Sequence, residues 1–103
     1  TQKPSSAASD VYKRQTRVLA NRLAERNINI NAIAPGPFQS QMMNETLKKY
    51  EKEIINSVPR KRIGVPEDMA GAAIFLSSKA SAYITGIVLP VDGGSLIARR
   101  HMV

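Results

Sequence analysis

The chain has 103 residues and a formal net charge of +7, with 43% hydrophobic and 5% aromatic residues. This composition predicts one globular domain at most, with a core of aliphatic side chains. The lack of cysteine excludes disulfides and thiolate metal sites, and no apolar run approaches the roughly 20 residues of a membrane span. The first residues also lack the apolar stretch of a secretory signal. We expect a cytoplasmic protein that contacts no membrane.

The first fifteen residues differ from the rest of the chain. They are small and polar, without an apolar period, and the run from Ser6 to Gln15 is similar to translated adapter sequence at the ends of assembled sequence fragments. We therefore expect residues 1–15 to be a non-native or disordered segment, and the domain to occupy residues 16–103. A natural flexible N-terminus is the alternative.

A helix and then a strand are predicted from Thr16 onward. Leu19, Ala20, Leu23 and Ala24 recur at helical spacing, which predicts a helix to about Arg26, and Asn27 is suited to end it. Residues 28–34 are short and rich in Ile, as a buried strand is. Because both faces of this strand are apolar, it fits a parallel sheet covered by helices.

Helix-prone residues 40–57 follow the turn Pro35-Gly36-Pro37, and a basic loop spans residues 60–64. Pro66 suits the first turn of a new helix, whose positive N-terminus favours Glu67 and Asp68. An apolar stripe on this helix consists of Met69, Ala72, Ala73 and Leu76.

The C-terminal third contains a loop at residues 79–86, a second strand at residues 87–91 and the turn Asp92-Gly93-Gly94. Helices that alternate with short apolar strands indicate an α/β sheet. Two strands do not make a stable sheet alone. The pattern therefore predicts that further strands come from an absent N-terminal part or from another chain.

Four motifs in order resemble the short-chain dehydrogenase/reductase family over about residues 16–96. They are Asn31-Ala32-Ile33-Ala34-Pro35-Gly36, then Arg62 to Ala70, then Phe75-Leu76-Ser77-Ser78 with Tyr83-Ile84-Thr85-Gly86, and finally Val91-Asp92-Gly93-Gly94. The resemblance implies a partial Rossmann-type, doubly wound parallel sheet, of which this chain is the C-terminal part with about two strands and their helices.

The resemblance also implies where a cofactor, NAD or NADP, would bind. It assigns Pro35, Gly36, Phe38, Ser40 and Met42 to the cofactor site, with the Phe38 backbone and the Ser40 hydroxyl facing the nicotinamide carboxamide. A glycine at the end of a strand would let a flat ring approach the backbone. Without the resemblance, an ordinary turn is the favoured interpretation of Pro35-Gly36, and a helix N-cap is an alternative role for Ser40.

No catalytic residue is predicted. The family's Gly-rich phosphate loop and catalytic Ser have no counterpart here, and its Tyr-x-x-x-Lys pair would fall near Ser5 and Ser9. Neither serine can replace the phenolate base or the cation. Asp92 before two glycines is expected to bond nearby backbone rather than a metal, and His101 lies in a basic tail.

The implied parent is an NAD(P)(H)-dependent oxidoreductase acting on a small hydroxyl or carbonyl substrate, of sugar-acid or 3-oxoacyl type, and a homodimer or homotetramer. We expect this chain alone to be inactive and to bind the cofactor weakly at best. Two alternatives remain: an interaction module that docks on full-length relatives through its last helix and strand, and a basic nucleic-acid binder. The positive charges are scattered and lack interleaved aromatic residues, so we expect no nucleic-acid partner.

Overall fold

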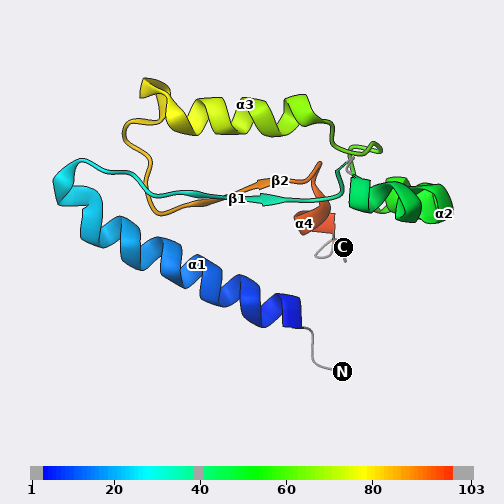
Figure 1. Cartoon of the computed structure of the whole chain (residues 1–103), viewed down its shortest axis with the longest axis horizontal. Helices are drawn as coiled ribbons and strands as arrows, with labels where there is room; N and C mark the ends of the chain where they lie inside the picture. Colours follow the sequence, from blue (N-terminus) through cyan, green and yellow to red (C-terminus); the bar gives the residue numbers. More distant parts are fainter. Residues whose placement is uncertain (1–3, 39–40, 99–103) are drawn as a thin grey trace. The chain divides into compact units, whose positions relative to one another are not determined.

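The computed structural model describes residues 4–38 and 41–98 (Figure 1). Its helices and strands alternate, which confirms the α/β class. In chain order they are α1 Pro4–Leu23, the 3₁₀ turn Ala24–Arg26, β1 Ala32–Pro35, α2 Gln41–Ser57, α3 Pro66–Ser77, a second 3₁₀ turn Lys79–Ser81, β2 Val88–Val91 and α4 Ser95–Ala98.

Strands β1 and β2 pair as a two-stranded sheet. The Ala32 amide donates to the Ile87 carbonyl at 2.9 Å, and the Gly36 amide donates to the Val91 carbonyl at 3.0 Å. Because the bonds advance in the same direction along both strands, the sheet is parallel, as Figure 1 shows. The predicted parallel sheet is thus confirmed for the two strands of this chain.

The first strand is shorter than the predicted range 28–34, and the second begins one residue later than expected. Residues 28–31 instead join residues 82–87 mainly through side chains. Asn31 donates from Nδ2 to the Ile84 carbonyl at 3.1 Å and accepts from the Ile87 amide at 3.1 Å. Side-chain amides therefore replace part of the backbone ladder here, which an alternation pattern does not reveal.

Helix α1 begins at Pro4, so the expected start near Thr16 was wrong. No Gly or Pro follows Pro4 before Leu23, and a proline is tolerated in the first turn, so the segment can form a helix without an apolar period. Thr16 is buried, and its hydroxyl donates to the Tyr12 carbonyl at 2.9 Å. The predicted stop is confirmed, because Asn27 is left-handed with a φ of 65°. The non-native origin of residues 1–15 stays a prediction.

The chain divides into two compact units, residues 1–33 with 75–89 and residues 34–74 with 90–103. Among the described side chains, the buried hydrophobic ones are Ala20 and Ala32 in the first unit and Val58 in the second. In the first unit, a Cβ atom on Gly86 would lie 3.4 Å from Ala20 Cβ, so helix α1 packs directly on this loop. Each unit therefore has only a small core of its own.

Three further features were not predicted. Helix α2 is kinked at Tyr50, α4 follows the glycine turn, and a 3₁₀ turn lies within the loop 79–86. Helix α3 begins at Pro66 as expected, but none of its residues is buried and Ala73 of the predicted stripe is exposed. Within the described ranges, no helix is both long and apolar enough to cross a bilayer.

Candidate functional site

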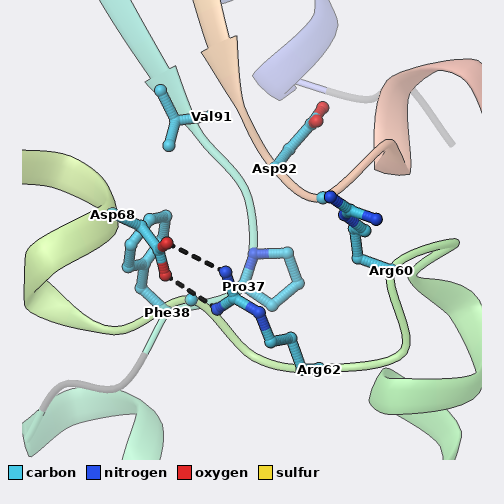
Figure 2. Close-up of a pocket in the computed structure, with 9 residues that line it drawn as sticks. Pro37, Phe38, Arg60, Arg62, Asp68, Val91 and Asp92 are labelled. Atoms are coloured by element: carbon cyan, nitrogen blue, oxygen red, sulfur yellow. Dashed lines mark hydrogen bonds and ion pairs between the residues drawn. The ribbon is translucent and has the colours of Figure 1, made fainter. Parts of the chain in front are cut away.

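Three loops of the second unit meet around one cavity (Figure 2). The first loop begins at Pro35, the last residue of β1, and ends at Phe38. The second is residues 58–64 between α2 and α3, and the third is residues 92–94 after β2. The first and third loops follow the C-terminal ends of parallel strands, which is where ligands bind in open α/β sheets. The cavity has a volume of about 130 Å³ and is lined by all three loops together with Asp68 and Val91.

Gly36 holds the first loop against the third. A Cβ atom on Gly36 would lie 2.6 Å from Asp92 Cβ and 2.9 Å from Asp92 Cα. Glycine is therefore required here because Asp92 occupies the space of a side chain. The approach of a cofactor ring to Gly36 stays a prediction, and the contact with Asp92 adds a packing reason for the glycine.

Gly64 joins the second loop to the first. Its amide donates to the Pro37 carbonyl at 2.9 Å, and Gly64 pairs with Phe38 as an isolated parallel bridge. A Cβ atom on Gly64 would lie 2.6 Å from Cε2 of the Phe38 ring. The second loop thus continues the parallel pairing beyond the end of β1.

The third loop packs on the second through Gly93 and Gly94. Both are left-handed, with φ of 63° and 95°, which favours glycine. A Cβ atom on Gly93 would lie 2.7 Å from Val58 Cγ1, and one on Gly94 would lie 3.1 Å from Pro59. Val58, at 1% exposure, is the most buried side chain of this unit.

Arg62 and Asp68 form a bidentate ion pair beside Phe38 (Figure 2), with N–O distances of 2.8 and 2.9 Å. Asp68 also accepts from the Val65 amide at 2.8 Å, which caps the N-terminus of α3. The hydrogen bond from Arg62, followed by that from Val65, holds the pKa of Asp68 well below its ordinary value. The hydrogen bond and charge of Asp68 raise the pKa of Arg62.

Asp92 bonds nearby backbone, as the sequence predicted. Its Oδ1 accepts from the Gly94 amide at 2.9 Å and its Oδ2 from the Leu96 amide at 3.0 Å. Both carboxylate oxygens are therefore engaged in the turn and in the first residues of α4. Among residues 4–38 and 41–98 the structure shows no group of three or more His, Cys, Asp or Glu suited to a metal ion.

The predicted cofactor residues Pro35, Gly36 and Phe38 lie together in the first loop. Ser40 lies outside the described residues, as does the side chain of Met42. Sequence reasoning missed the Arg62–Asp68 pair and the role of Gly64. The available signal was Asp68 in the first turn of a helix that begins with proline, since an acidic residue there accepts a hydrogen bond from the backbone.

The lining of the cavity is partly charged. Arg60, Arg62 and Asp68 line it together with Pro37 and Phe38. Sites that enclose a drug-sized ligand have volumes of roughly 300–1,000 Å³. At about 130 Å³, this cavity is too small to enclose a whole dinucleotide.

Comparison with known proteins matches residues 6–95 to the profile of the enoyl-(acyl carrier protein) reductase family. The chain is 45% identical over 83 residues to 2-dehydro-3-deoxy-D-gluconate 5-dehydrogenase of Dickeya dadantii, covering 79% of this chain and 33% of that protein. It is 43% identical over 82 residues to 3-oxoacyl-(acyl-carrier-protein) reductase of Rickettsia bellii, covering 80% and 34%. The chain therefore spans about a third of the length of these relatives.

Solved structures agree with the sequence matches. A protein from Agrobacterium tumefaciens assigned as a 2-deoxy-d-gluconate 3-dehydrogenase, with bound NADP, has a TM-score of 0.79 and 42% identity, covering 87% of this chain and 37% of its own. One from Beutenbergia cavernae assigned as an NAD(P)-dependent gluconate 5-dehydrogenase, also with bound NADP, has a TM-score of 0.80 and 38% identity, with the same coverage. With its parallel strands and the match over residues 6–95, the chain belongs to the short-chain dehydrogenase/reductase family.

Proposed function

We propose that this chain is the C-terminal part of an NAD(P)(H)-dependent oxidoreductase that interconverts a hydroxyl and a carbonyl group. The observation that carries the proposal is the family match over residues 6–95, within which Pro35, Gly36 and Phe38 lie at the C-terminal end of a parallel strand. Relatives of about three times the length include sugar-acid dehydrogenases and 3-oxoacyl reductases, which supports a substrate of one of these types.

The cofactor, when bound, supplies or accepts the hydride. The role of this chain would be to hold the nicotinamide end: the Phe38 backbone and the Ser40 hydroxyl would bond the carboxamide, with Pro35, Gly36 and Met42 beside them. A hydroxyl can both donate and accept a hydrogen bond, which suits an amide partner. The chain contains no Tyr-x-x-x-Lys sequence, so it would not perform the proton transfer by itself.

A chimera tests this function. Residues 16–98 would replace the corresponding part of the Dickeya dadantii relative, with which the match is 45% identical. We expect the chimera to keep nicotinamide-dependent oxidoreductase activity, while the 103-residue chain shows none. In the chimera, Ser40→Ala should raise KM for the cofactor by about tenfold, because one hydrogen bond to a buried amide is lost. A folded chimera without activity, or one indifferent to Ser40→Ala, would refute the assignment.

A second candidate, an interaction module that docks on relatives, is favoured by α3. Ala and larger apolar side chains surround much of this helix, yet no residue of it is buried and Ile74 is 69% exposed. Helices that are apolar on most sides are usually covered by protein. Co-expression with a full-length relative would test this: mixed oligomers that are lost on Ile74→Lys support docking, and absence of mixed oligomers refutes it.

A further inference from the structure

We propose that the three loops form a closed ring of mutual contacts that sets the position of the Pro35–Phe38 backbone, and that Gly64 and Gly93 are positioning residues for it. The inference rests on the proposed function only in so far as this backbone contacts a cofactor. The contacts themselves belong to the free chain and can be measured without a ligand.

Each loop contributes a glycine, and a group of the next loop occupies the space that a side chain on this glycine would take. The direction is the same around the ring, from the first loop to the third, from the third to the second, and from the second back to the first. The contacts, given as distances from an added glycine Cβ, are Gly36 to Asp92 at 2.6 Å, Gly93 to Val58 at 2.7 Å, and Gly64 to Phe38 at 2.6 Å.

Backbone hydrogen bonds follow the same three contacts. They are Arg60 N to Gly93 O at 3.0 Å, Gly64 N to Pro37 O at 2.9 Å, and Gly36 N to Val91 O at 3.0 Å, where Val91 is the last residue of β2 and directly precedes the third loop. Each loop thus contributes one glycine and also occupies the space beside a glycine of another loop. A shift of one loop would therefore change its contacts with the other two. The Arg62–Asp68 pair adds an anchor, because it ties the second loop to the first turn of α3.

The position of the first loop therefore depends on contacts with residues of the other loops. Pro35 and Pro37 fix two φ angles but remove two amide donors, so the segment has few bonds of its own. Its Pro37 carbonyl is held by Gly64, and its Phe38 ring lies against the same glycine. Groups that orient a reactant must be held within about 0.5 Å of the productive geometry. Gly64 therefore matters to the site although it lies in another loop.

Amide hydrogen exchange of the free 103-residue chain tests the ring. An added methyl group at residue 64 would meet the Phe38 ring, so Gly64→Ala should accelerate exchange at Gly36 by about tenfold, a typical effect of overpacking. Gly71→Ala is the matched control, because nothing lies within 4 Å of its added Cβ. It should leave Gly36 unchanged.

Rescue separates positioning from general loss of structure. Phe38→Ala removes all three ring carbons that the new methyl would meet, so the double variant with Gly64→Ala should regain slow exchange at Gly36, relative to Phe38→Ala alone. Unchanged exchange in Gly64→Ala, or acceleration throughout the chain without rescue, would overturn the ring. If the chimera is inactive but the exchange results are as expected, the proposed cofactor role is refuted and the ring of loop contacts is supported.

Discussion

Gly36→Ala distinguishes two reasons for a glycine after β1. If the residue is small only to let a ring approach, the variant should weaken cofactor binding and leave stability unchanged. The structure predicts destabilisation without any cofactor. The new methyl carbon would lie 2.6 Å from Asp92 Cβ and 2.9 Å from its Cα. Because the second obstacle is backbone, rotation of a side chain cannot relieve it.

The expected cost follows from this geometry. Overpacking typically costs 1–3 kcal/mol, and a backbone obstacle places Gly36→Ala near the upper value, about 3 kcal/mol. Gly71→Ala, exposed on α3 with open space around it, should instead stabilise by about 0.5–1 kcal/mol. Urea unfolding followed by circular dichroism measures both. If Gly36→Ala is as stable as Gly71→Ala, the packing explanation is wrong.

The remaining predictions concern charge, activity and association. The folded pKa of Asp68 lies below its ordinary value of 3.8, so the stabilisation by its carboxylate is complete above that pH and is lost as the pH falls further. In urea unfolding, the free energies of unfolding of wild type and Asp68→Asn should therefore converge in acid. A difference that stays constant with pH would contradict the ion pair. The purified chain should not oxidise or reduce a nicotinamide cofactor above a buffer control in an absorbance assay. Any binding to DNA should be non-specific and should collapse with added salt, whereas sequence-selective binding at high salt would favour the nucleic-acid hypothesis. Sedimentation should show self-association at micromolar concentration, because Ile74, Tyr83 and Ile97 are exposed apolar side chains; a stable monomer would argue against it.

Local signals in the sequence predicted the elements that depend on nearby residues. Pro66 marked the start of α3, Asn27 the end of the first helical segment, and Asp92 the turn after β2. Each depends on bonds within a few residues. The start of α1 was missed because a helix needs propensity and the absence of breakers, and not only an apolar stripe.

The candidate site was predicted only in part. Pro35, Gly36 and Phe38 were found through the motif that ends β1, but Gly64 and the Arg62–Asp68 pair were not. The residues next to a glycine in the sequence do not indicate which distant residue packs against it. Contacts such as Gly64 with Phe38 depend on how the chain returns to the end of the sheet, which periodicity does not encode.

The pairing next to the start of β1 depends on a single side-chain amide, that of Asn31. Its side chain donates to one carbonyl of the loop 82–87 and accepts from one amide of it, as a peptide unit would. An aspartate at this position could still accept but would turn a negative oxygen toward the Ile84 carbonyl. An Asn31→Asp substitution would therefore replace an attraction with a repulsion beside the Ile84 carbonyl, next to the start of β1.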